Sequence, residues 1–144
     1  MTITTPAFVG RPDPPVTPDT RAWWDATRRR QLTVQRCDAC GHAQLYPRVL
    51  CTACGALELH LEPVSGRAVV HSHSTVATSP NPALFVPPYV VALVVLAEGP
   101  TMLTDIVGPR AGAVRCDDPV HVVWEALPDG RHLPLFAPIE QDLD

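Results

Sequence analysis

Hydrophobic and polar residues alternate along much of this chain, with the period of two that is typical of strands with one buried face. Short alternating runs occupy residues 32–36 and 57–61. After Gly66 the predicted strands are longer and cover 67–77, 89–96, 101–107, 120–124 and 131–136. Asp129-Gly130 between the last two is a typical hairpin turn. The pattern predicts a mainly β protein with a C-terminal five-stranded barrel of the OB type, although other five-stranded barrels share this pattern.

One segment near the N-terminus has helical character. Asp19 or Thr20 is a suitable N-cap for a helix that runs from about Thr20 to Arg30 and carries the adjacent Trp23 and Trp24. Two neighbouring side chains on a short helix cannot both face one core. We therefore expect either one indole to stay partly exposed for a ligand or partner, or both to help cover the domains that follow.

Prolines divide the chain into segments. The sequence has 17 of them, with clusters at 6–18 and 80–88, and this density favours short strands joined by rigid turns over long helices. We expect four parts: an extended proline-rich arm (1–18), the N-terminal helix (19–31), a cysteine-rich ribbon (32–63) and the barrel domain (64–140).

Four of the five cysteines form two CxxC pairs, each followed by glycine: Cys37, Cys40, Cys51 and Cys54. Two residues between cysteines let one turn direct both sulfurs at the same ion, and the glycine accepts the positive φ that closes the turn. With alternating runs on either side, the segment has the layout of a rubredoxin-like zinc ribbon. Four thiolate ligands leave no open coordination position, so we expect a structural Zn²⁺.

Disulfides and iron are the alternatives to zinc. No signal-like apolar segment precedes the cysteines, and we expect a cytoplasmic location, where thiols stay reduced. No stretch of about 18 apolar residues suggests a membrane span. Rubredoxins bind iron with similar CxxCG pairs, but the ten-residue connection here is shorter than we expect for them. Cys116 lies alone in a polar segment and is interpreted as an incidental thiol.

The charge balance weakens a role in nucleic-acid binding. The net charge is −4, and all 11 basic residues are arginine, whereas affinity for phosphate backbones requires a basic face. The one basic run, Arg28 to Arg30, is too short to supply it. A nucleic-acid-binding zinc-ribbon/OB module stays as the alternative hypothesis. No catalytic motif is apparent, so we assign no catalytic residue and leave open whether the chain is an enzyme.

From about residue 19 to 139, the order of these parts resembles the zinc-ribbon/OB-fold family called domain of unknown function 35, which is associated with acyl-CoA metabolism. The resemblance rests on short motifs: Trp24, 32–37, the two CxxCG pairs, Pro47-Arg48, 65–67, 88–90, 96–100 and 133–136. One departure is that arginine occupies positions 29 and 30, near which the family pattern leads us to expect glycine. This leaves the end of the helix undetermined.

The resemblance implies a partner more than a reaction. Family members look like non-catalytic subunits that form hetero-oligomers with thiolases, with thiolase-fold aldolases acting on steroid side-chain thioesters, or with MaoC-like enoyl-CoA hydratases. The helix, ribbon and barrel would then bind or channel acyl-CoA, and the partner would supply the catalytic residues. Arg28, its neighbours Arg29 and Arg30, and Arg48 suit phosphates. The candidate aromatic contacts are Trp23, Trp24 and Phe85.

Overall fold

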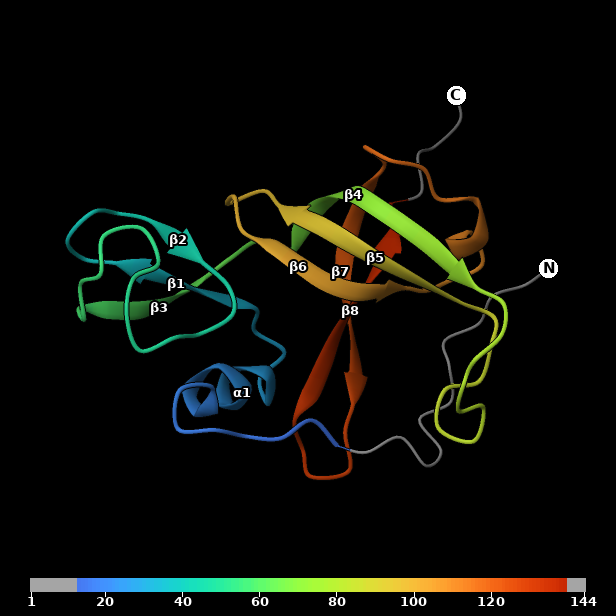
Figure 1. Cartoon of the computed structure of the whole chain (residues 1–144), viewed down its shortest axis with the longest axis horizontal. Helices are drawn as coiled ribbons and strands as arrows, with labels where there is room; N and C mark the ends of the chain where they lie inside the picture. The colour runs from blue at the N-terminus through green and yellow to red at the C-terminus, as the bar shows by residue number, and fades with distance from the viewer. Residues whose placement is uncertain (1–12, 140–144) are drawn as a thin grey trace.

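The computed structural model of the chain describes residues 13–139 and contains a short helix, a three-stranded sheet and a five-stranded barrel (Figure 1). The expected mainly β fold with a zinc ribbon and an OB-type barrel is confirmed. Most of the predicted proline-rich arm, and residue 140 of the predicted barrel domain, lie outside the described residues. Among residues 13–139, no helix is long and apolar enough to cross a membrane.

The ribbon sheet has the order β2-β1-β3, and both pairings are antiparallel. Its strands are β1 (Thr33–Cys37), β2 (Ala43–Gln44) and β3 (Leu59–Pro63). β1 pairs with β3 along its whole length, from Thr33 opposite Pro63 to Cys37 opposite Leu59. The central strand buries Val34 completely, so the alternation seen in the sequence directs one face of β1 toward the core.

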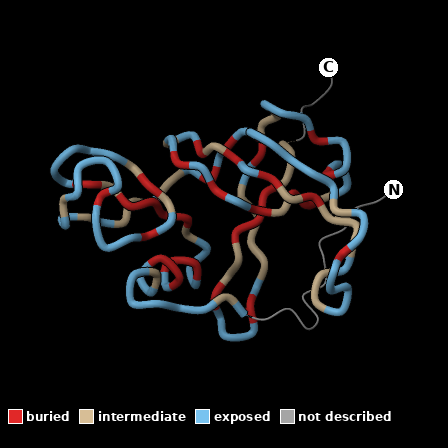
Figure 2. Tube along the Cα trace, in the orientation of Figure 1, coloured by how far each residue is buried: buried red, intermediate tan, exposed pale blue. Residues whose placement is uncertain are grey.

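The barrel closes in the order β4-β5-β6-β8-β7. Its elements are β4 (Arg67–Val76), β5 (Tyr89–Leu96), β6 (Thr101–Ile106), the 3₁₀ turn η1 (Ala111–Ala113), β7 (Pro119–Ala126) and β8 (His132–Pro138). In Figure 2 many of the buried residues lie within the barrel strands. The fully buried side chains of this core include Val70, Val90, Val94, Val120 and Phe136.

Closure of the barrel is uneven. β7 and β8 pair in register from Val120 opposite Pro138 to Ala126 opposite His132. By contrast, the parallel pairing of β6 with β8 is confined to Ile106 opposite Phe136. Among residues 13–139, no strand pairs with the remainder of β6 on that edge, and this gap shapes the surface described below.

Helix α1 (Arg21–Thr27) packs against both domains, and it buries both of its tryptophans. Trp23 is 4% exposed and Trp24 is 8% exposed, with the ring planes at 88° to each other. The Nε1 of Trp23 donates to the carbonyl of Thr33 in the ribbon at 3.0 Å, while the Arg131 guanidinium of the β7–β8 hairpin lies over Trp24 at 4.8 Å. Each indole faces a different neighbour, which is the second of the two expectations.

The helix ends earlier than the expected Arg30. Its last assigned residue is Thr27, and the backbone of Arg28 still has helical angles, with φ of −60° and ψ of −28°. The N–H of Arg30 then donates to the carbonyl of Thr27 at 2.9 Å, and the N–H of Gln31 donates to the carbonyl of Ala26 at 3.1 Å. These two bonds form a Schellman motif, which terminates a helix by placing the residue at C′ in the left-handed conformation. Arg30 is that residue, with φ of 54°.

Candidate functional site

The four predicted cysteine ligands converge at one end of the ribbon. Their sulfur atoms all lie within 4.8 Å of one another. The Sγ atoms of Cys37 and Cys54 are 3.7 Å apart, and those of Cys40 and Cys51 are 3.6 Å apart. A zinc ion with four sulfurs at about 2.3 Å has neighbouring sulfurs separated by about 3.8 Å. The donor set and its spacing therefore fit a structural Zn²⁺, and these distances are too long for disulfide bonds.

The two knuckles have matching backbone geometry. Gly41 and Gly55 have φ of 77° and 79°, and each donates its N–H at 2.9 Å to the carbonyl of the first cysteine in its pair, Cys37 or Cys51. Glycine adopts this conformation without a Cβ clash. The sequence pattern CxxCG thus encodes the same turn twice, and the folded ribbon brings the sulfurs of the two turns together.

The clustered thiols have unequal acidities. Burial of Cys51 opposes ionisation, but backbone N–H groups of Cys54 and Ala53 and hydrogen bonds from neighbouring thiols lower its pKa to about 6. At Cys54 a backbone hydrogen bond from Ala56 favours the thiolate, yet hydrogen bonding to Cys40 together with burial raises the pKa to about 12. Four thiolates so close together repel one another, and a divalent cation at their centre would remove that repulsion.

Two buried glutamines hold the segment between the knuckles. The side-chain Nε2 of Gln35 donates to the carbonyl of Arg48 at 2.9 Å, and the Oε1 of Gln35 accepts from the backbone N–H of Arg48 at 2.8 Å. Gln44 donates to Gln35 at 2.9 Å and accepts from the N–H of Thr52 at 2.9 Å. The backbone of Arg48 is therefore fixed in the ribbon, while its side chain is exposed on the surface.

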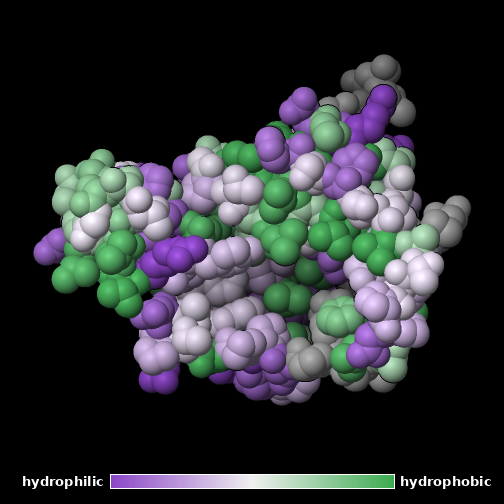
Figure 3. All heavy atoms as spheres, viewed as in Figure 1, coloured by the Kyte–Doolittle hydropathy of each residue, from purple (hydrophilic) through white to green (hydrophobic). Residues whose placement is uncertain are grey.

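A second feature is an apolar groove of about 480 Å³ beside the incomplete β6–β8 pairing. β6 and β8 separate on the N-terminal side of the Ile106–Phe136 pair, and side chains from both strands line the gap. Phe85 and Pro80 of the β4–β5 loop also line it. Figure 3 shows a hollow with hydrophobic atoms around it near the centre of this face. The other lining residues are Ser79, Tyr89, Val91, Leu103, Thr104, Asp105, Leu133, Pro134 and Leu135.

The edge of β6 next to this groove is joined to the ribbon by one side chain. The hydroxyl of Tyr46 accepts from the N–H of Leu103 at 3.0 Å and lies 3.4 Å from the carbonyl oxygen of the same residue, to which it donates. Tyr46 is 43% exposed and Leu103 is 56% exposed. Tyr46 thus satisfies the backbone polar groups of Leu103, whereas the apolar side chain of Leu103 stays exposed, as is typical of a surface that another molecule covers.

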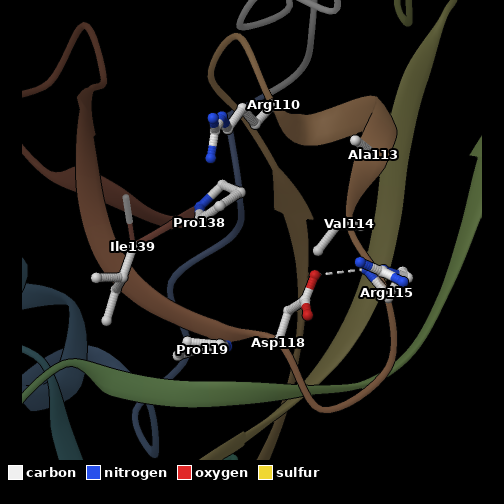
Figure 4. Close-up of a pocket in the computed structure, with 8 residues that line it drawn as sticks. All are labelled: Arg110, Ala113, Val114, Arg115, Asp118, Pro119, Pro138 and Ile139. Carbon is white, nitrogen blue, oxygen red and sulfur yellow. Dashed lines mark hydrogen bonds between the residues drawn. The ribbon is translucent and has the colours of Figure 1, made fainter. Parts of the chain in front are cut away.

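A third hollow, of about 420 Å³, lies at the η1 end of the barrel and is more polar (Figure 4). Arg110 and Arg115 line it together with Asp118, whose carboxylate accepts from the backbone N–H of Arg115 at 2.8 Å. This carboxylate disfavours an anion beside it, because like charges repel at short range. The mixed charges make the hollow a poorer ligand site than the apolar groove.

The five candidate acyl-CoA contacts are not brought together. Trp23 and Trp24 are buried, so neither presents an open ring face, and Phe85 lines the groove. Arg28 lies at the helix C-terminus, where its Nη1 donates to the carbonyl of Asp129 at 2.7 Å, and Arg48 lies on the ribbon. Neither arginine lines the groove.

Sequence reasoning missed the groove itself. The alternating pattern predicts that Leu103, Leu133 and Leu135 lie in strands, but it gives no indication that they line one groove. Alternation within a strand indicates which side chains share a face, whereas the gap arises from how β6 and β8 diverge. The available signal is the motif Leu133-Pro134-Leu135-Phe136, which is part of the resemblance to the family.

Two family models match consecutive parts of the chain. Residues 24–60 match the rubredoxin-like zinc ribbon domain of ChsH2, and residues 61–125 match the C-terminal OB-fold domain of ChsH2. Together they cover the ribbon, the second half of α1 and most of the barrel.

Among curated relatives, a probable enoyl-CoA hydratase alpha subunit from Thermomonospora curvata is 34% identical over 128 residues. That alignment covers 89% of this chain but only 40% of the relative, so the chain spans less than half of that protein's length. A DUF35 domain-containing scaffold protein from Methanothermobacter thermautotrophicus is 32% identical over 115 residues, covering 78% of this chain and 85% of the relative.

Two solved structures of DUF35 proteins also match the chain. The structure described as the Ltp2-ChsH2(DUF35) aldolase matches with a TM-score of 0.78 and 33% identity, covering 88% of this chain and 98% of the matched chain. A DUF35 protein of unknown function from Sulfolobus solfataricus matches with a TM-score of 0.64 at 13% identity, which supports the fold alone, over 86% of this chain and 87% of that one. The chain therefore belongs to the DUF35 family, with a ChsH2-type zinc ribbon followed by an OB-fold domain.

Proposed function

We propose that this chain is a non-catalytic accessory subunit that binds an acyl-CoA and stabilises a thiolase-like aldolase or thiolase in a hetero-oligomer. The observation that carries the proposal is the apolar groove at the β6–β8 gap, whose volume is in the range of small-molecule sites. The zinc holds the ribbon in shape and takes no part in a reaction, because four cysteines would leave it no open position.

The comparisons support a scaffolding role. One relative is described as a scaffold protein, and a solved relative is part of an aldolase that also contains Ltp2. The hydratase alpha subunit makes a MaoC-like hydratase the second candidate partner. We favour the aldolase or thiolase, because that structural match covers nearly the whole of the matched chain, whereas the hydratase subunit is matched over a minor part.

In this proposal the groove holds the acyl part of the ligand. Phe85 of the β4–β5 loop and Leu133 and Leu135 of β8 are among the apolar side chains that line it. Burying an acyl chain there removes apolar surface from water on both molecules, at about 25 cal/mol for each Å² buried. The thioester and the phosphates would stay outside the apolar lining, where arginine side chains can pair with the phosphates.

The test is acyl-CoA binding by the purified chain, with octanoyl-CoA as the probe. Phe85→Asp should weaken binding by about tenfold or more, because it places a charge against the acyl chain. Val86→Asp is the matched control, since Val86 is 52% exposed and does not line the groove. Equal effects of the two substitutions, or no binding by the wild type, would contradict the acyl-binding role.

The partner role is tested by co-expression with a thiolase-fold aldolase subunit. A stable complex in which the partner becomes more soluble supports the proposal. Recovery of the two chains as separate species, with no gain in partner solubility or activity, counts against it. If the chain instead shifts single-stranded DNA in a salt-dependent manner at micromolar concentration, the alternative of a nucleic-acid-binding module is favoured.

A further inference from the structure

Arg30 occupies a backbone conformation that favours glycine. Its φ of 54° lies in the left-handed region, where an L-residue has its Cβ close to the following carbonyl oxygen. At the C′ position of a Schellman motif glycine is the usual residue, because it lacks this Cβ. Arginine therefore makes the folded protein less stable than glycine would at this position. This cost suggests that the arginine side chain serves a purpose other than stability.

The guanidinium of Arg30 differs from those of its two neighbours. Arg28 donates to the carbonyl of Asp129 and lies 3.6 Å from the carboxylate of Asp25. Arg29 reaches the side-chain oxygen of Gln31 at 3.4 Å. Arg30 is exposed, and within residues 13–139 its side chain has no hydrogen bond or ion pair. The backbone strain at this residue thus coincides with an uncommitted positive charge.

The turn that carries Arg30 is linked through Thr27 to the strand that lines the apolar groove. The carbonyl of Thr27 accepts from the N–H of Arg30 at 2.9 Å and lies 2.9 Å from Nδ1 of His132. The hydroxyl of Thr27 also accepts from the backbone N–H of His132 at 3.2 Å. His132 is the first residue of β8, and the next residue, Leu133, lines the groove. The turn that carries Arg30 is therefore fixed against the start of the groove-lining strand.

We infer that Arg30 binds a phosphate group of the CoA whose acyl part occupies the groove. This inference rests on the proposed function and names a residue for the polar end of the ligand. The guanidinium offers a planar set of N–H donors that pairs with two phosphate oxygens. An arginine at this position lowers the stability of the folded protein compared with glycine. Such a loss of stability is common at residues that serve binding.

The experiment compares Arg30→Gly and Arg30→Ala with Arg21→Ala, which removes one positive charge from the exposed first residue of the same helix. Arg30→Gly should lower the equilibrium constant for unfolding by about two- to fivefold, because it relieves the left-handed strain at some entropic cost. Both Arg30 variants should weaken octanoyl-CoA binding by about three- to tenfold. Arg21→Ala should not weaken it.

The probe octanoyl-pantetheine lacks the phosphates and separates the two proposals. It should bind the wild type and both Arg30 variants equally. If octanoyl-CoA binds the wild type and Arg30→Gly with the same affinity, the role of Arg30 is overturned while the groove proposal stands. If neither probe binds the wild type, both proposals fall. Equal weakening by Arg21→Ala would mean a general charge effect and would also overturn the role of Arg30.

Discussion

Replacing Cys40 by serine tests the metal site most directly. The Sγ of Cys40 lies 3.6 Å from that of Cys51 and belongs to a group of four sulfurs within 4.8 Å of one another. Serine keeps the size of the side chain but does not supply a thiolate. Three cysteines then remain, and we expect the bound zinc to fall from about one ion per chain to almost none.

The structural consequence follows from how little the ribbon buries by itself. Among residues 32–63 the buried apolar side chains are Leu32, Val34, Cys37 and Cys51, and the last two belong to the sulfur cluster itself. In comparable small domains zinc binding supplies about 10–16 kcal/mol, which becomes the folding free energy. Without it the ribbon should lose its fixed structure. The barrel has its own buried side chains, such as Val70 and Val94, and should stay folded with lower stability.

The assay combines metal analysis with amide hydrogen exchange. In Cys40→Ser the amides of β1 and β3 should exchange much faster than in the wild type, while those of β5, which pairs with β4 on one side and β6 on the other, should stay protected. Cys116→Ser is the control, because Cys116 is exposed and lies outside the cluster. A Cys40→Ser protein that is free of metal and keeps its ribbon amides protected would refute the structural role of zinc.

Three further substitutions test the barrel and its hairpin. Phe136→Ala should destabilise the protein by about 3–5 kcal/mol in urea titrations, because this fully buried ring lies at the β6–β8 contact. Gly66→Ala should cost about 1–3 kcal/mol, since a Cβ at φ of 81° would collide with Cγ1 of Val122. Asp129→Asn should remove an acid-sensitive part of the stability, because the backbone N–H of Arg131, then its guanidinium, lower the pKa of Asp129 in the folded protein.

The direction of the pH effect of Asp129→Asn follows from the linkage between proton binding and the free energy of unfolding. A carboxyl group whose folded-state pKa is lowered stabilises the fold above its unfolded value and loses that contribution as pH falls through the folded value. The melting temperatures of wild type and Asp129→Asn should thus differ at pH 7 and converge in strong acid. A difference that does not change with pH would contradict this explanation. Leu103→Ala, which truncates an exposed side chain, serves as the control for Phe136→Ala.

The metal site could be predicted from the sequence because its geometry is local. Each CxxCG turn directs two sulfurs to one side of the chain, and the short alternating runs around the turns pair as neighbours. The OB-type barrel could also be predicted, since the polar and apolar positions of its strands alternate and proline and glycine mark its turns. The place of the helix could be predicted but not its end: the glycine expected near positions 29 and 30 is the residue that a left-handed turn favours, and arginine there conceals the turn.

The sequence by itself determined where most of the strands lie, which side chains share a face and which cysteines are the candidate metal ligands. Only the tertiary structure decided that both tryptophans are buried, that β6 and β8 diverge to leave a groove, and that Thr27 holds the turn of Arg30 against the start of β8. The physical reason is the range of the interactions. Turn geometry and alternation depend on residues close in the chain, whereas the groove depends on the register of strands some 30 residues apart, which is set when the whole barrel closes.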